Sequence, residues 1–388
     1  MDELVDRSLL DLVETIVDNR GRTCPTATEG TPLIATNCLK DGKRDVVYEN
    51  IRFVDEDTYA NWFRGHPEPG DVLFVCKGSP GRVAVVPDPV PYCIAQDMVA
   101  LRANSTTDPG YLYYRLRSPD VQFGIQNMHV GTMIPHFKKG DFGRLTFPVH
   151  SSLDAQHAIA QVLGALDDKI AANELVVQRA DELSRAHWME ATTAFDAVQL
   201  SQIADFVNGR AFTKDATGTG RVVVRIAELN SGIGPSTVYN EIEAADENLV
   251  RPGDLLFAWS GSLTVARWFR PEAIVNQHIF KVIPKPGYPM WLVNQAVRSK
   301  LPDFKAVASD KATTMGHIQR RHLDEEVRIP MQDSMQCLDA VMASLWSNAL
   351  AVEMENLKLA RTRDSIIPLL MSGKVAVQTA ENFIGDVT

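Results

Sequence analysis

The sequence has few residues suited to disulfides or to metal binding. Its five cysteines are odd in number, and no pair has the C-x-x-C spacing of redox or zinc motifs. The nine histidines are scattered and form no cluster of ligands. We therefore expect reduced cysteines and no bound metal, as is usual in the cytoplasm.

Long apolar segments are absent as well. No apolar run reaches the roughly 18 residues that suggest a membrane-spanning helix. The N-terminal segment MDELVDRSLL is acidic and lacks the basic start of a secretory signal. We expect a cytoplasmic protein that makes no contact with a membrane.

Common catalytic motifs are missing from the chain. There is no G-x-x-x-x-G-K-[ST], no H-E-x-x-H and no G-x-S-x-G. The run Asp88-Pro89-Val90-Pro91-Tyr92 is similar to the D-P-P-Y of amino-methyltransferases, but it has one residue too many and no F-x-G-x-G accompanies it. A proline-rich turn is the better interpretation. We expect no catalytic residue and no cofactor.

The net charge of −10 argues against a nucleic-acid partner when it is taken alone. Its distribution along the chain is more informative. Residues 151–190 and 333–388 together hold 7 basic and 14 acidic side chains, whereas the rest of the chain holds 32 basic and 35 acidic ones. Most of the negative excess therefore lies in two segments, and the larger blocks permit a DNA-binding face.

These two acidic segments have the heptad pattern of long helices. Apolar residues recur in alternating steps of three and four, which predicts a narrow helix–helix seam. The predicted seam residues of the first helix are Ile159, Leu163, Leu166, Ile170, Asn173 and Val177. Those of the second helix are Val341, Leu345, Val352, Leu359 and Ile366. Asn173 opposite Glu355 or Asn348 would fix their alignment, although each helix alone could also pack on its own block.

The block before each helix repeats one order of landmarks. The repeats lie 181 to 190 residues apart, and each block is rich in short β-like runs punctuated by Gly and Pro. The paired landmarks are Gly70–Phe74 with Gly253–Phe257, Gly78-Ser79 with Gly261-Ser262, Thr132–Phe137 with Thr313–Ile318, and Phe147-Pro148 with Ile329-Pro330. We infer an internal duplication in which a shared scaffold carries different loops.

The polar loops of each block are candidate DNA contacts, because basic, hydroxyl and imidazole side chains can bond phosphates or base edges. Hairpin turns and solvated surface charges explain each loop equally well when it is taken alone. The candidates in the first block are Arg20, Arg22, Thr23, Lys77, Ser79, Arg82, His129, Thr132 and His136. Those in the second block are Arg210, Thr213, Lys214, Ser260, Ser262, Lys311, Thr314 and His317.

The order of these motifs resembles the specificity subunit of type I restriction–modification systems. The carriers are the two G-D-[VL]-L-F runs, the Gly-Ser turns, the run Ala273–His278, the two Thr-x-x-x-His segments, and the Phe-Pro and Ile-Pro pairs that precede the long helices. The first block departs from the second in having Gln96-Asp97 in place of Gln277-His278, and in Pro135.

The resemblance implies an α+β fold with two target recognition domains, joined by two long antiparallel helices that form a coiled-coil spacer. The domains would be residues 1–150 and 191–332, the helices residues 151–190 and 333–375, and residues 376–388 a mobile tail. Each domain would recognise half of a bipartite, asymmetric sequence in double-stranded DNA. Two methyltransferase subunits and the restriction and translocase subunits would perform the chemistry.

Two other classes of function remain open on the sequence alone. A protein-binding adaptor could use the repeated blocks to hold two copies of a partner. An enzyme with an unfamiliar site is the third alternative.

Overall fold

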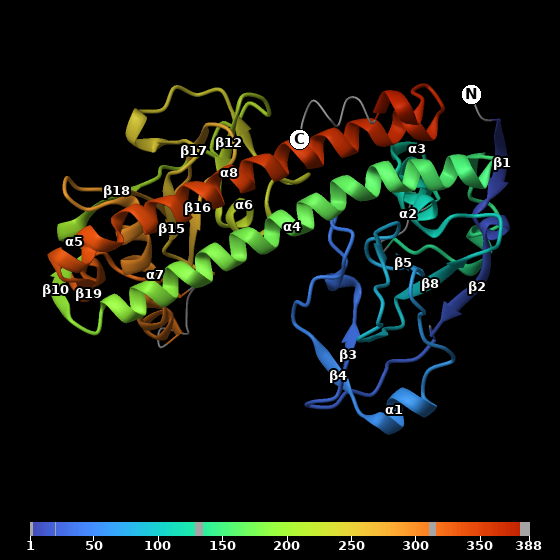
Figure 1. Cartoon of the computed structure of the whole chain (residues 1–388), viewed down its shortest axis with the longest axis horizontal. Helices are drawn as coiled ribbons and strands as arrows, with labels where there is room; N and C mark the ends of the chain where they lie inside the picture. The colour runs from blue at the N-terminus through green and yellow to red at the C-terminus, as the bar shows by residue number, and fades with distance from the viewer. Residues whose placement is uncertain (1–2, 20, 129–134, 310–315, 381–388) are drawn as a thin grey trace. The chain divides into compact units, whose positions relative to one another are not determined.

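The computed structural model describes residues 3–19, 21–128, 135–309 and 316–380. The chain has two compact units, one formed by Met1–Ile170 with Lys358–Thr388 and the other by Ala171–Leu357. We call them unit 1 and unit 2. Each unit contains strands, shorter helices and a part of each of two long helices, so the predicted α+β class is confirmed (Figure 1).

Unit 1 is built on two small sheets and one strand pair. The main sheet has the order β2-β8-β5-β6, the second sheet β4-β3-β7, and β1 pairs with β9. The strands are β1 (Leu4–Ser8), β2 (Val13–Asp18), β3 (Thr31–Ile34), β4 (Arg52–Val54), β5 (Val72–Val75), β6 (Val83–Val85), β7 (Cys93–Ile94), β8 (Met98–Ala103) and β9 (Thr146–His150). The helices confined to the unit are α1 (Glu56–Asn61), α2 (Pro109–Arg117) and α3 (Pro119–Asn127).

Unit 2 repeats this topology. Its main sheet has the order β11-β18-β15-β16, its second sheet β13-β12-β17-β14, and β10 pairs with β19. The strands are β10 (Phe195–Gln199), β11 (Ala204–Asn208), β12 (Arg221–Val224), β13 (Tyr239–Asn240), β14 (Leu249–Val250), β15 (Leu255–Ala258), β16 (Thr264–Arg267), β17 (Ala273–Val275), β18 (Ile279–Pro284) and β19 (Glu326–Pro330). The helices confined to the unit are α5 (Leu200–Ile203), α6 (Ile226–Ser231) and α7 (Met290–Ser309).

The repeated G-D-[VL]-L-F motif forms the central strand of each main sheet. Side chains alternate across a strand, so both faces of β5 are used. Val72 and Phe74 pack toward the helices, whereas Leu73 and Val75 pack toward the second sheet. Strand β15 divides its residues in the same way. The strand residues of the motif are therefore all apolar, because the strand is buried on both sides.

The Gly-Asp pair before this strand makes the turn that leads into it. Gly70 and Gly253 have φ of 84° and 96°, which favours glycine. The Asp71 carboxylate accepts from the Glu68 amide at 2.8 Å and from Arg102 at 3.0 and 3.1 Å. In unit 2 the Arg251 amide donates to Asp254 at 2.8 Å. The duplication thus preserves the turn as well as the strand.

The long helices are α4 (Leu153–Ala191) and α8 (Gln332–Met371), and they pack antiparallel within each unit. Of the predicted seam residues, Ile159, Leu163, Leu166, Leu359 and Ile366 are buried, as is Asn173. Ile170, Val177, Leu345 and Val352 are half-buried. Val341 differs from the expectation: it is 46% exposed, and the neighbouring Met342, 1% exposed, takes the inward position.

Polar groups on the seam pair across the two helices. In unit 2, Asn173 Nδ2 donates to Glu355 and to Asn356, both at 2.8 Å, so Glu355 is the partner among the two alternatives. In unit 1, buried Arg363 donates to buried Asp167, which also accepts from the Tyr114 hydroxyl at 2.7 Å. Burial, together with the Asp167 carboxylate, raises the pKa of Tyr114. Such pairs have few equivalent partners nearby, so they favour one register.

The expected mobile tail begins with residues that are packed in unit 1. Ala380 is buried and Val377 contacts the core, and residues 381–388 lie outside the described residues. Among the described residues, no helix has both the length and the apolar character needed to span a bilayer.

We predict that Arg363→Met lowers the free energy of unfolding by about 3 kcal/mol, because Asp167 would remain buried without its main ion-pair partner. Urea denaturation of the purified chain measures this change. Arg361→Met, in an exposed position of the same helix, is the control and is expected to change stability by less than about 0.5 kcal/mol. The double variant Asp167→Leu/Arg363→Met is expected to recover most of the loss. A double variant as unstable as the single one would contradict this explanation.

Candidate nucleic-acid interface

Three backbone segments of unit 1 meet where β5 ends. The amides of Cys76 and Lys77 donate to the Asp97 carbonyl at 2.9 and 3.2 Å. The Gly78 amide donates to the Pro135 carbonyl at 3.0 Å, and Phe137 donates to Cys76 at 2.7 Å. Lys77 and His136 form an isolated β-bridge. We call this arrangement the first junction; the hydrogen bonds given above all join main-chain groups.

The side chains at the first junction surround a polar cavity of about 360 Å³. Residues from four parts of the sequence line it, among them Arg22, Thr23, Lys77, Gln96, Asp97 and His136. Four of these were candidates from the sequence. Gln96 and Asp97 were noted there only as a departure between the repeats, and they are the cavity residues that sequence reasoning missed.

Arg22 is held at this cavity by an aromatic side chain. Its guanidinium lies 5.1 Å from the centre of the Trp62 ring, and it donates to the Trp62 carbonyl at 3.2 Å. Stacking on an aromatic face limits the freedom of an arginine while leaving other donors available. Burial raises the pKa of the adjacent Cys24 thiol against the opposing effect of Arg52 and Arg22, so this thiol stays protonated at neutral pH.

Unit 2 contains the same main-chain arrangement, which we call the second junction. The Trp259 amide donates to the His278 carbonyl at 3.1 Å, Gly261 donates to Gly316 at 2.9 Å, and Ile318 donates to Trp259 at 3.1 Å. Ser260 and His317 form the isolated bridge that Lys77 and His136 form in unit 1. The bonding pattern is thus repeated although the residues differ.

The side chains at the second junction are largely aromatic. Trp259 lies 5.1 Å from the His278 ring and 6.4 Å from the His317 ring. The Trp259 indole donates to Asn208 at 2.8 Å, which fixes its orientation. Gln277 and His278 are exposed, and His278 has a φ of 73°. Sequence reasoning missed Trp259 and His278 as candidates. Their positions in the sequence could have identified them, because Trp259 lies just before the repeated Gly-Ser turn and His278 ends the run Ala273–His278.

The loop carrying the basic candidates of unit 2 is tied to the second junction. The Gln277 amide donates to the Arg210 carbonyl at 2.9 Å, and the Phe212 amide donates to the Asn276 side chain at 3.1 Å. Thr213 and Lys214 follow in the adjoining turn, and Arg210 lies 3.9 Å from Glu247. Arg210 thus joins Ser260 and His317 at this junction.

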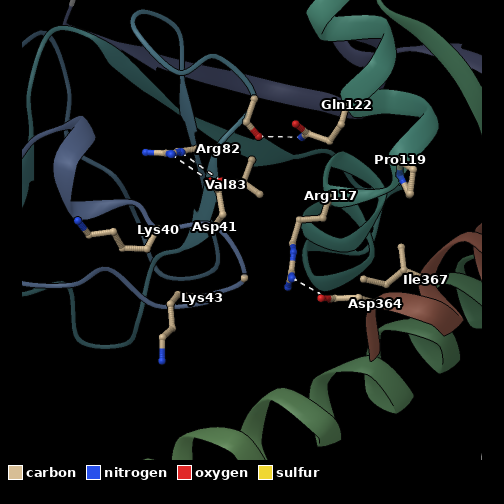
Figure 2. Close-up of a pocket in the computed structure, with 12 residues that line it drawn as sticks. Lys40, Asp41, Lys43, Arg82, Val83, Arg117, Pro119, Gln122, Asp364 and Ile367 are labelled. Atoms are coloured by element: carbon tan, nitrogen blue, oxygen red, sulfur yellow. Dashed lines mark hydrogen bonds and ion pairs between the residues drawn. The ribbon is translucent and has the colours of Figure 1, made fainter. Parts of the chain in front are cut away.

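Arg82 lies at a different place from the other candidates of unit 1. It donates to Asp41 at 3.1 and 3.0 Å and lines a cavity of about 250 Å³ with Arg117 and Asp364 (Figure 2). Figure 2 also shows the Gln122 amide donating to Gly81, at 2.9 Å. Arg82 is therefore engaged in an ion pair away from the cavity of Lys77 and His136.

The remaining candidates divide into two groups. Ser79 is half-buried and Ser262 exposed, each in the turn after the central strand of its sheet. Five candidates lie outside the described residues: Arg20, His129, Thr132, Lys311 and Thr314. Among the described residues, no group of three or more His, Cys, Asp and Glu could hold a metal ion.

The chain thus contains one main-chain junction twice, with different side chains at each copy. Residues 24–179 match the sequence family described as "Type I restriction modification DNA specificity domain". This segment of the chain is therefore similar to DNA specificity domains. Among curated proteins, no sequence matches this chain.

One solved structure shares the fold, and a second is similar at a lower score. A crystal structure of the type I restriction–modification S subunit from M. genitalium has 14% identity and a TM-score of 0.55, over 95% of this chain and 96% of that one. The HsdS subunit from Thermoanaerobacter tengcongensis has 14% identity and a TM-score of 0.38, over 96% and 97% of the two chains.

We predict that Gly209→Ala destabilises unit 2, because a Cβ there would lie 2.2 Å from the Asn276 carbonyl oxygen and 2.3 Å from that of Val275. Both neighbours are backbone, so the loop carrying Arg210 would have to move; we expect a loss of about 2 kcal/mol or more. Thermal unfolding measures it. Gly234→Ala, where nothing lies within 4 Å, is the matched control. Equal melting temperatures for the two variants would show that this close approach is unimportant.

Proposed function

We propose that the chain is a non-catalytic DNA-recognition subunit that binds a bipartite, asymmetric target in double-stranded DNA. Residues 1–150 would recognise one half-site and residues 191–332 the other. The observation that carries this proposal is the pair of junctions: one main-chain pattern presents Lys77 and Asp97 in unit 1, and Trp259 and His278 in unit 2.

The difference between the junctions favours an asymmetric target. Sequence is recognised through the donors and acceptors that base pairs present in the major groove. A cation and a carboxylate in unit 1 match a different base-pair pattern from the aromatic and imidazole groups in unit 2. Two identical half-sites would not require this divergence on a shared scaffold. The long helices would link the two recognition domains as a spacer.

The acidic composition favours partners that supply affinity for DNA. Phosphate contacts by Lys and Arg provide much of the affinity of DNA-binding proteins, and this chain has a net charge of −10. We therefore propose that two methyltransferase subunits dock on the chain and that restriction and translocase subunits join the complex. These partners would carry the catalytic centres.

The long helices offer an apolar face for such docking. On α4, Val176 and Leu183 are 48% and 47% exposed, and they lie seven residues apart, hence on one side of the helix. Exposed apolar side chains that share one face are typical of a protein contact. We propose this face of α4 as part of the methyltransferase interface.

The assembled complex is predicted to select a two-part sequence from random duplex DNA, whereas the isolated chain binds weakly at physiological salt. Selection followed by sequencing measures the first outcome, and a titration of labelled selected DNA measures the second. A protein-binding adaptor would enrich no sequence, and nanomolar binding by the isolated chain would contradict the need for a partner. Methylation of DNA by the isolated chain with S-adenosylmethionine would instead indicate an enzyme.

The double variant Val176→Glu/Leu183→Glu is predicted to reduce co-purification of the methyltransferase at least tenfold, because charged groups would enter an apolar contact. Its melting temperature should stay near that of the wild type, since both positions face solvent in the isolated chain. Phe123→Glu, an exposed apolar position on α3 with 66% exposure, serves as the control. Unchanged co-purification of the double variant would place the methyltransferase elsewhere.

A further inference from the structure

The main chain of Asp97 holds the first junction together, whereas its side chain lines the cavity. The Asp97 carbonyl accepts from Cys76 and Lys77, so the backbone holds the junction whatever side chain is present. Among the described residues, the Asp97 carboxylate has no hydrogen-bond or ion-pair partner, and the same is true of the Lys77 ammonium group. Both side chains line one cavity, and both are accessible to solvent.

A carboxylate at a DNA interface limits which DNA groups can lie next to it. Phosphate oxygens would be repelled, so Asp97 has no favourable contact with the DNA backbone. A base amino group is the partner that would gain a hydrogen bond from it. In the major groove, carboxylates accept from the N4 amino group of cytosine, and lysine donates to the O6 and N7 atoms of guanine. A neighbouring Asp and Lys therefore complement the two members of one C·G pair.

We infer that Asp97 and Lys77 together recognise one C·G base pair in the half-site of unit 1. Asp97 accepts a hydrogen bond from cytosine N4, and Lys77 donates to guanine O6 or N7. With the pair reversed, the carboxylate would face the two acceptors of guanine; with thymine, it would face the O4 acceptor. Adenine also offers an amino group, but its partner thymine gives Lys77 one acceptor, O4, beside a methyl group, whereas guanine gives it two acceptors, O6 and N7. This inference rests on the proposed DNA-binding function.

The second junction supplies an internal comparison. His278 there takes the place of Asp97, since its carbonyl accepts from Trp259 as that of Asp97 accepts from Cys76. Ser260 takes the place of Lys77 in the bridge to a histidine. At these two equivalent positions unit 1 has a cation and a carboxylate, whereas unit 2 has Ser260 and His278, so we expect the C·G preference in the half-site of unit 1.

The test uses the assembled complex and the target that selection identifies for the wild type. Each position is varied in turn, and relative binding to all four base pairs is measured. The wild type is expected to prefer C·G at one position of a single half-site. Asp97→Asn should reduce that preference about tenfold or more, because an amide no longer excludes acceptor groups, whereas Asp97→Glu should keep it. The other half-site should not change.

The matched control is Asp88→Asn, which makes the same chemical change at an exposed position outside the cavity. A second measurement needs no variant: wild-type complex is titrated with a target whose cytosine is replaced by an analogue lacking the 4-amino group. We expect a loss of about tenfold at the position that Asp97 determines and little loss at other cytosines.

The outcomes distinguish failure of the role inferred for Asp97 from failure of the proposed DNA-binding function. If Asp97→Asn leaves every position unchanged, or the analogue binds as tightly as cytosine throughout the half-site, the role of Asp97 is refuted while the proposed function stands. A change in both half-sites for Asp97→Asn would also refute it. A wild-type complex that selects no sequence would refute the proposed function itself.

Discussion

The main-chain hydrogen bonds at the two junctions are the constraint on which the rest of the arrangement depends. Amide-to-carbonyl bonds join the end of the central strand to two other segments in each unit. Because no side chain takes part in these bonds, the residues at the junction can change without loss of the scaffold. This separation explains how Lys77 and Asp97 in one unit correspond to Ser260 and His278 in the other.

The long helices differ from the junctions, because polar side chains fix the alignment of α4 with α8. Asn173 in unit 2 and the Asp167–Arg363 pair in unit 1 are buried on the seam. A purely apolar seam would tolerate a slip by one heptad, whereas these groups would then lose their partners. Each unit thus carries its own register-setting contact between α4 and α8. The helices can therefore support recognition loops whose own sequences vary.

The duplication, the fold class and much of the seam could be predicted because strand, turn and heptad patterns are local. Details set by tertiary packing could not. Heptad spacing does not distinguish Val341 from Met342, since both are apolar, and only the packed helix shows Met342 inward. The sequence also gives no sign that Arg82, a candidate DNA contact, forms an ion pair with Asp41, which lies 41 residues earlier. Asp97 was overlooked because an acidic residue is an unexpected component of a DNA-binding face.

That acidic residue fits a chain in which selectivity and affinity are supplied by different subunits. A protein that binds DNA alone needs many phosphate contacts, and an unpaired carboxylate beside them weakens binding. A subunit whose partners provide those contacts can include Asp97, since the role proposed for its carboxylate is to disfavour wrong base pairs. The excess of acidic side chains on the helices is compatible with this division as well, because the helix surfaces are proposed to contact protein subunits and not DNA phosphates. With this division, the net charge of −10 is compatible with sequence recognition, because the partner subunits would supply the phosphate contacts that the chain lacks.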